Sequence, residues 1–179
     1  MCVAVGTVWF CLASALIAED VKPGQQVEIR TTLGSFVVEL DPASSPGACR
    51  AFLSYIRQHV YQESSFYQKD EEDIQGGRPG LYAQGFSRSG NFVHDPPPGE
   101  FKLTHVRGAV GLARTVGDCN PTKSSNSTQF YVMVKDEPKD DGEYSIFGRV
   151  ISGIDVVDKI ANALSADKTQ PVKFDVVAL

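Results

Sequence analysis

The sequence predicts a single, mainly β domain, and three observations support this class. Short apolar or alternating segments recur from residue 26 to the end of the chain. Only two segments have apolar residues at helical spacing, one after the first pair of strands and one before the last strand. With 179 residues, 42% of them hydrophobic, the chain is long enough for one well-packed core but short for two. The pattern favours a barrel or a sandwich that two helices plug or flank.

The first strands and the first helix follow one another closely. QVEIR (26–30) and SFVVEL (35–40) alternate apolar and polar residues on either side of TTLG, which predicts an antiparallel hairpin. Ser45 is a good N-cap residue and Pro46 suits the first helical position. We therefore expect a helix from about Pro46 to His59.

The second half of the chain predicts further strands and one more helix. Residues 80–98 are rich in Gly, Pro, Ser and Asn, which indicates a long loop. SGIDVVDKIANAL (152–164) has apolar residues on one helical face. The strands expected after the loop are 109–114, 128–134, 144–150 and 172–179.

The first 18 residues have the composition of a signal peptide. MCVAVGTVWFCLASALIA contains no charged side chain and includes an apolar run, Val8–Ile17. We expect removal after Ala18, a linker over 19–25, and export to the periplasm or the cell exterior. The alternative is an N-terminal membrane anchor, but the run is short for a hydrocarbon core about 30 Å thick. We expect no membrane association of the mature chain.

The positions of the cysteines and histidines and the net charge indicate whether a disulfide, a metal site or a nucleic-acid site is expected. After cleavage only Cys49 and Cys119 remain, and we expect two free thiols, although one disulfide is the alternative. His59, His94 and His105 are isolated from one another, so no metal or other cofactor is expected. The net charge is −5 and the 17 Lys and Arg are scattered, which argues against nucleic acid as a partner.

Six motifs in a fixed order carry a family resemblance. They are TTLGSFVVELDPASSPGACRAFL, SFY, IQGG, HVRGAVGLAR, NSTQFYV and DGEYSIFGRVISGIDVVDKI. From about Val27 to Leu179 the chain resembles the cyclophilins, the cyclosporin-binding class of peptidyl-prolyl isomerases. The resemblance implies a domain over 26–179, built as a closed antiparallel β-barrel of eight strands that two α-helices cap. It also implies a groove on the outer face that binds proline-containing peptides or unfolded polypeptides. We expect a monomer.

The chemistry implied is rotation about an Xaa-Pro bond. The barrier is about 18 to 20 kcal/mol because the amide loses resonance when it twists. A hydrogen-bond donor aimed at the prolyl nitrogen lowers it. In cyclophilins this donor is the Arg of Phe-His-Arg, and the matching tripeptide is Phe66-Tyr67-Gln68. Gln68 therefore takes the catalytic position, and its neutral carboxamide predicts weak activity.

Further positions match the groove of the family. Gln75 matches the glutamine that holds the substrate backbone, and Tyr131 stands where an aromatic ring floors the proline pocket, whereas Phe130 is more typical of barrel core. Lys139 and Asp140 replace apolar residues of the family. The substrate-binding residues that the resemblance implies are Phe66, Gln75, Leu112, Ala113, Gln129, Phe130, Tyr131 and Tyr144.

A charged run interrupts the matched segment. KDEED (69–73) stands where the family has an apolar strand, and the segment is one residue shorter. Because unpaired buried charge is costly, we expect a solvated loop here, with the strand resuming at Ile74. The alternative is that the run recognises a basic partner. Two functions therefore stay open, a weakened isomerase and an inactive cyclophilin fold that binds proline peptides or serves as a scaffold.

Overall fold

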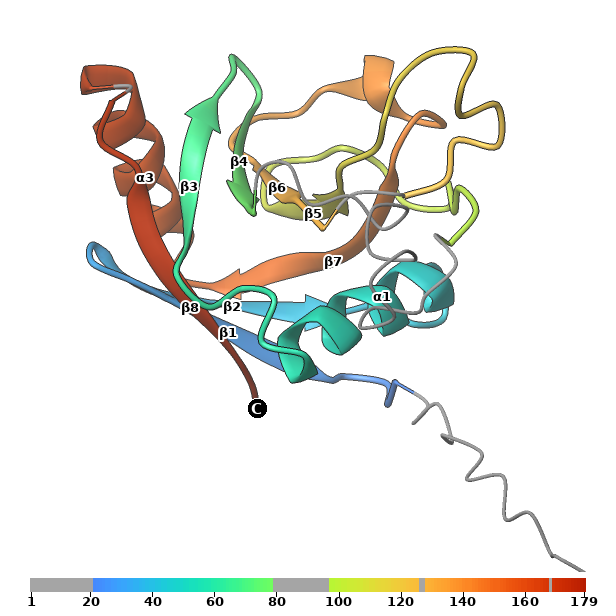
Figure 1. Cartoon of the computed structure of the whole chain (residues 1–179), viewed down its shortest axis with the longest axis horizontal. Coiled ribbons are helices and arrows are strands. Elements are labelled where there is room, and N and C mark those ends of the chain that lie inside the picture. The colour runs from blue at the N-terminus through green and yellow to red at the C-terminus, as the bar shows by residue number, and fades with distance from the viewer. Residues whose placement is uncertain (1–20, 79–96, 126–127, 168) are drawn as a thin grey trace, which may run out of the picture.

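The computed structural model is a closed antiparallel β-barrel with a helix at each end (Figure 1). It describes residues 21–78, 97–125, 128–167 and 169–179. The strand order around the barrel is β1-β2-β7-β5-β6-β4-β3-β8. The strands are β1 (Gln26–Thr31), β2 (Gly34–Leu40), β3 (Ser64–Lys69), β4 (Asp73–Gly77), β5 (Ala109–Leu112), β6 (Phe130–Met133), β7 (Ser145–Ser152) and β8 (Val172–Ala178).

The architecture confirms the predicted fold class and selects the barrel over the sandwich. Each predicted strand is present, with shorter ends in β5 and β6. The proposed signal peptide (1–18), most of the proposed loop (80–98), and residues 126–127 lie outside the described residues.

The first hairpin shows how alternation builds the barrel. Val27 and Ile29 of β1 are fully buried, while the residues between them face outward. The turn is closed by Thr31, whose hydroxyl donates to the carbonyl of Gly34 at 2.8 Å. Gly34 has a φ of +125°, a conformation that favours glycine over other residues. The sequence TTLG therefore fixes the register of β1 and β2.

Helix α1 (Pro46–Arg57) covers one end of the barrel and is capped in an unexpected way. Ser45 is the N-cap residue, but its hydroxyl donates to the carbonyl of Ile146 at 2.5 Å. The carboxylate of Glu100 instead accepts hydrogen bonds from the first-turn amides of Gly47 and Ala48, each at 2.9 Å. This contact ties the helix to a segment that is distant in sequence, and the negative charge suits a helix N-terminus.

Two further elements complete the described fold. Helix α3 (Ile154–Ala166) packs on β2, β3, β4 and β8, at the other end of the barrel from α1 (Figure 1). It buries the apolar face that its sequence predicts. A 3₁₀ helix, η1 (Pro138–Asp140), follows β6 and was not predicted. No helix in the described part of the chain is long and apolar enough to cross a membrane.

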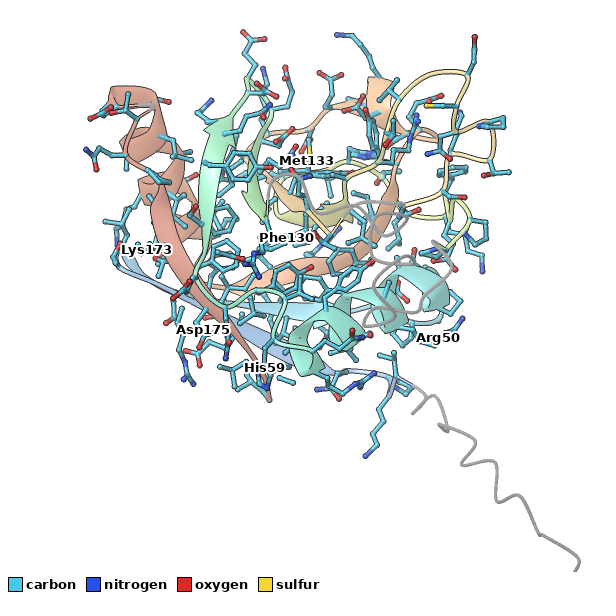
Figure 2. All side chains as sticks on the ribbon, viewed as in Figure 1. Arg50, His59, Phe130, Met133, Lys173 and Asp175 are labelled. Carbon is cyan, nitrogen blue, oxygen red and sulfur yellow. The ribbon has the colours of Figure 1, made fainter. Side chains whose placement is uncertain are left out.

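Aromatic rings fill the barrel interior. Phe130 lies in the middle of the barrel (Figure 2) and packs against Phe66 at 5.7 Å and Phe52 at 5.4 Å between ring centroids. Phe66 also packs against Phe174 at 4.8 Å. A second apolar cluster, consisting of Ala109, Tyr131, Met133 and Ile146 with three half-buried neighbours, lies apart from this main core.

We expect Phe66→Ala to lower the free energy of unfolding by about 3 to 5 kcal/mol, because it leaves a cavity among these rings. Denaturant unfolding measures the change. The control is Leu33→Ala, at an exposed position in the first turn, which should change stability by about 0.5 kcal/mol or less. Unchanged stability together with lost peptide binding would show that Phe66 faces a groove instead of the core.

Candidate functional site

A polar cleft of about 430 Å³ lies outside the barrel wall, where β4, β5 and β6 meet η1. It brings together five of the predicted substrate-binding residues, which are Gln75, Ala113, Gln129, Tyr131 and Tyr144. Tyr131 and Tyr144 belong to the second apolar cluster, which backs the cleft. The other lining residues are Asp70, Glu72, Asp73, Arg114, Thr115 and Asp140.

A one-residue bulge in β3 decides which side chain reaches this cleft region. Phe66 pairs with Gly76, but the next paired residue is Gln68, opposite Gln75, so Tyr67 is the extra residue. In a regular strand Phe66 and Gln68 would face the same side. The bulge keeps Phe66 inside the barrel and turns Gln68 outward.

Tyr67, and not Gln68, is hydrogen-bonded to both glutamines of the cleft. The Nε2 of Gln75 donates to the hydroxyl of Tyr67 and to the Oε1 of Gln129, both at 2.9 Å. The hydroxyl of Tyr67 donates to the same Oε1 of Gln129. These bonds hold the three polar side chains as one network.

Gln68 lies at the edge of this arrangement. Its side chain is exposed, and its Nε2 donates to Oδ2 of Asp70 at 2.9 Å. The described structure therefore places the carboxamide of Gln68 against the β3–β4 turn, while Tyr67 provides the hydroxyl nearest to Gln75 and Gln129.

The ring of Tyr131 is fixed by a buried histidine. The Nε2 of His105 lies 2.9 Å from the hydroxyl of Tyr131, and its Nδ1 lies 2.9 Å from Oδ1 of Asp141. Hydrogen bonds from His105 lower the pKa of Asp141, so its carboxylate is an acceptor and Nδ1 carries the proton. The Nε2 of a neutral His105 then accepts a hydrogen bond from the Tyr131 hydroxyl. A Cβ at Gly111 would lie 2.2 Å from this hydroxyl, so the glycine makes room for the phenol.

Four carboxylates line the same cleft. Asp70, Glu72 and Asp73 come from the β3–β4 turn and the start of β4, and Asp140 comes from η1. The turn and η1 lie along one side of the barrel (Figure 1). Burial raises the pKa of Asp73 to about 7, and the repulsion of Asp70, Asp140 and Glu72 adds to the shift. Burial also raises the pKa of Asp140.

The one arginine in the lining is already engaged. Arg114 is almost buried, and its Nη2 lies 2.9 Å from Oε2 of Glu143. Its Nε donates to the carbonyl of Glu143 at 2.7 Å, and its guanidinium lies 4.8 Å from the ring centroid of Tyr144. Glu143 also pairs with Lys123 at 2.5 Å, so this one carboxylate faces two cations. In the described residues the ion pair of Arg114 is with Glu143 and not with a carboxylate of the cleft.

The sequence model described as "Cyclophilin type peptidyl-prolyl cis-trans isomerase/CLD" matches residues 26–178. The chain belongs to the cyclophilin family. The fold agrees, because a cyclophilin of Cryptosporidium parvum superposes with a TM-score of 0.69 at 26% identity, covering 87% of this chain and 97% of that one. A second structure of that protein, in the presence of the dipeptide Ala-Pro, gives a TM-score of 0.68 at 26% identity, with 87% and 99% coverage.

Curated cyclophilins cover most of the same span. A peptidyl-prolyl cis-trans isomerase of Dictyostelium discoideum is 33% identical over 150 residues, which are 83% of this chain and 91% of the relative. One of Acinetobacter baylyi is 31% identical over 157 residues, which are 84% of this chain and 79% of the relative. Their shared activity makes the cleft beside Tyr131 the candidate groove of this cyclophilin.

Three predicted substrate-binding residues of this cyclophilin do not line the cleft. Phe66, Leu112 and Phe130 are fully buried in the main core, because the pleat of β3, β5 and β6 directs them into the barrel. Lys139 is 88% exposed and does not line the cleft, whereas its neighbour Asp140 does. The sequence motifs therefore identify the strands of the site, and the pleat selects the side chains.

The charged run forms a turn, as predicted, with different ends. Asp70 to Glu72 are the turn, Lys69 still belongs to β3, and β4 resumes at Asp73, one residue before Ile74. A salt bridge from Lys135 to Glu72 at 3.3 Å holds the turn against the end of β6. Asp73 enters the cleft because it begins β4 opposite Met133 of β6. The sequence shows the charged run, but it does not show that Asp73 lines the cleft.

Tyr67, Asp73 and Arg114 are the residues of this site that the motifs did not identify. Tyr67 belongs to the tripeptide Phe66-Tyr67-Gln68, in which the family resemblance implies the catalytic donor at Gln68. Asp73 was assigned to a solvated loop, and Arg114 simply follows the matched pair Leu112-Ala113.

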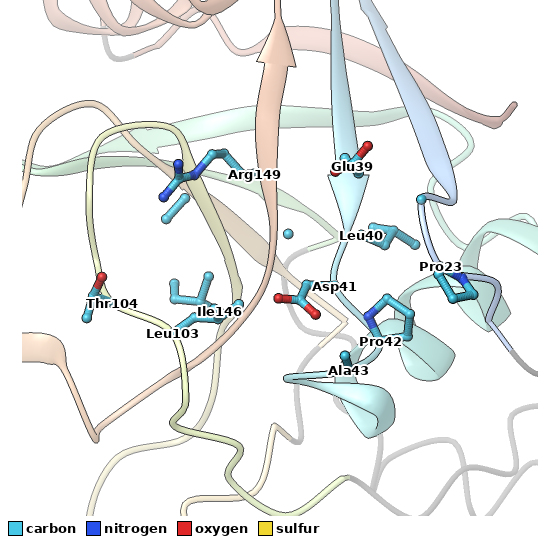
Figure 3. Close-up of a pocket in the computed structure, with 13 residues that line it drawn as sticks. Pro23, Glu39, Leu40, Asp41, Pro42, Ala43, Leu103, Thr104, Ile146 and Arg149 are labelled. Carbon is cyan, nitrogen blue, oxygen red and sulfur yellow. The ribbon is translucent and has the colours of Figure 1, made fainter.

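A second cleft of about 430 Å³ lies behind the second apolar cluster (Figure 3). Leu103 and Ile146 line one side of it and Leu40 and Pro42 the other. Two carboxylate residues, Glu39 and Asp41, also line it, and Asp41 accepts a hydrogen bond from the amide of Ser44 at 3.0 Å. None of the predicted site residues lines it. Among the described residues, no group of three or more His, Cys, Asp or Glu side chains could hold a metal ion.

The pKa of Asp73 predicts how stability depends on pH. The folded chain holds the Asp73 proton up to about pH 7, while the unfolded chain releases it near pH 4. The stability that the protonated carboxyl contributes is complete below pH 4 and is lost as the pH rises to 7. Relative to Asp73→Asn, the wild type should lose about 2 to 4 kcal/mol of unfolding free energy between pH 4 and pH 8.

Urea unfolding at several pH values measures this difference. The control is Asp175→Asn, an exposed position on β8, which should keep the pH profile of the wild type. Parallel profiles for the wild type and Asp73→Asn would contradict the raised pKa.

Proposed function

We propose that this cyclophilin is a peptidyl-prolyl cis-trans isomerase that acts on Xaa-Pro bonds of polypeptides with reduced turnover. The observation that carries the proposal is the cleft that joins Gln75, Gln129 and Tyr131 on a cyclophilin barrel. An aromatic floor fixed by His105 suits a proline ring, and two carboxamides suit the peptide backbone beside it. The relatives bear the name of the same activity.

The reduced turnover follows from the donors of the site. The network around Gln75 contains one phenol and two carboxamides, all neutral. Charge-assisted hydrogen bonds are about twice as strong as neutral ones, and a loss of about 1.5 to 3 kcal/mol in the transition state slows a reaction about 10- to 100-fold. A cyclophilin with an arginine donor should therefore be faster by about that factor.

A second candidate is a proline-peptide binding module without turnover. It is favoured by Gln68, which is exposed and hydrogen-bonded to Asp70, so the matched donor position does not face the two glutamines. The two candidates differ in catalysis and share peptide binding.

Exchange-rate NMR on a short blocked Xaa-Pro peptide separates them. Residues 19–179 at catalytic concentration should accelerate cis-trans exchange if the chain is an isomerase. Line broadening or shifts of the peptide without faster exchange would support the binding module. No effect on the peptide at any concentration would overturn both.

Tyr67→Phe should lower kcat/KM for this peptide about 10-fold, because it removes a hydroxyl that is hydrogen-bonded to both Gln75 and Gln129. The same NMR experiment measures the rate, and circular dichroism checks the fold. Gln68→Ala is the matched comparison in the same strand, and we expect it to change the rate less than about 3-fold because the side chain is exposed. The opposite ranking of the two variants would restore Gln68 as the donor.

We also propose that the mature chain begins at Glu19, is exported, acts as a monomer and aids the folding of other proteins. The support is the uncharged, apolar composition of residues 1–18 and the family activity. A partner chain with exposed prolines is the expected client.

A further inference from the structure

We propose that the groove selects peptides with a lysine or arginine directly before or after the proline, and that Asp73 and Asp140 recognise the cation. The inference rests on the proposed function, because the same groove binds the proline. The family and the glutamine pair indicate the groove, and the carboxylates determine which peptides it prefers.

The first argument is the unbalanced charge of the lining. Glu72 pairs with Lys135 at 3.3 Å, and Asp70 accepts a hydrogen bond from Gln68 at 2.9 Å. The side chains of Asp73 and Asp140 have neither an ion pair nor a hydrogen bond within the described ranges, 21–78, 97–125, 128–167 and 169–179. The positive charge of Lys69 acts on Asp73, but its ammonium donates to the carbonyl of Asp70 at 2.5 Å. Two carboxylates therefore line one cleft without an ion pair to either among the described residues.

The second argument is that this arrangement is costly for the empty protein. The carboxylates repel one another in a partly dry cleft, and that repulsion contributes to the raised pKa of Asp73. Arg114 lies in the same lining, but its ion pair is with Glu143 and not with Asp73 or Asp140. A ligand that brings a positive charge removes the repulsion, whereas a ligand that brings a negative charge increases it. The groove thus favours cationic peptides by attraction and disfavours anionic peptides by repulsion.

The third argument is the position of the two carboxylates relative to the aromatic floor. Asp73 and Asp140 line the cleft together with Tyr131 and Tyr144, and the charges of both carboxylates act on the Tyr131 hydroxyl. A proline ring on Tyr131 would place the side chain of an adjacent residue beside these carboxylates. The cation is a side chain of the peptide and not a metal ion, because the described residues offer no group of three metal ligands.

The experiment compares blocked peptides that differ only next to the proline. Lysine, glutamine or glutamate is placed directly before the proline in one set and directly after it in another. Titration by NMR gives Kd, and exchange spectroscopy gives the isomerisation rate. We expect the lysine peptide of at least one set to bind about 10-fold more tightly than the glutamine peptide, and the glutamate peptide more weakly.

Two variants assign the preference to residues. In Asp73→Asn/Asp140→Asn the ratio of lysine to glutamine affinity should fall to about 2 or less. Asp175→Asn makes the same chemical change on β8, at a position distant from Met133 at the end of β6 (Figure 2), and should keep the wild-type ratio. If the double variant does not fold, Asp140→Asn alone must lower the ratio at least about 3-fold.

The outcomes separate this inference from the proposed function. Equal affinity for the lysine and glutamine peptides, with accelerated exchange of both, would overturn the inference and leave the isomerase. An equal loss of preference in the double variant and in Asp175→Asn would show that net charge, and not these two residues, is responsible, which also overturns it. Binding of no peptide, the glutamine peptides included, would overturn the proposed function itself.

Discussion

The pleat of a closed barrel is the constraint on which the remaining structure depends. Each strand must direct alternate residues into the interior, and rings such as Phe66 and Phe130 fill that interior without a gap for other side chains. A groove can therefore use only outward positions, such as Gln75 of β4 and Tyr131 of β6. The bulge at Tyr67 satisfies this constraint in β3, because it keeps Phe66 inside while two successive residues after it reach the outer face.

The strands, the helices and the site segment could be predicted because they depend on local patterns. Alternation identified β1 and β2, helical spacing identified α1 and α3, and the ordered motifs identified the family. The side chains that meet in the cleft depend on contacts between distant segments, which no local pattern contains. Glu100 caps α1 from outside the helix, and Asp73 and Asp140 approach each other only when β4 and η1 are in place.

The charged groups of the cleft also lower the stability of the folded protein when Asp73 is ionised. A carboxyl whose proton is held to about pH 7 lowers the stability of the ionised protein, and Asp73 would be more favourable as a neutral side chain. The polar groups behind the aromatic floor of the cleft are, in contrast, paired by hydrogen bonds. His105, Tyr131 and Asp141 satisfy one another completely, so the aromatic floor is rigid beside a charged rim that is unsatisfied. Such a pairing of a rigid floor with an unbalanced rim is typical of binding sites.

Two departures from the family motif are related: Gln68 stands in place of an arginine, and the charged run 69–73 follows it directly. An arginine at position 68 would lie next to Asp70, whose Oδ2 already accepts the hydrogen bond from Gln68, and the two charges would pair. A guanidinium held in that pair could not also turn toward a prolyl nitrogen. With glutamine at this position Asp70 has a neutral partner, while Lys135 pairs with Glu72 on the same turn. Under the proposed function, a neutral glutamine at this position is a weaker donor for isomerisation than an arginine, and the carboxylates of the groove would favour a basic peptide.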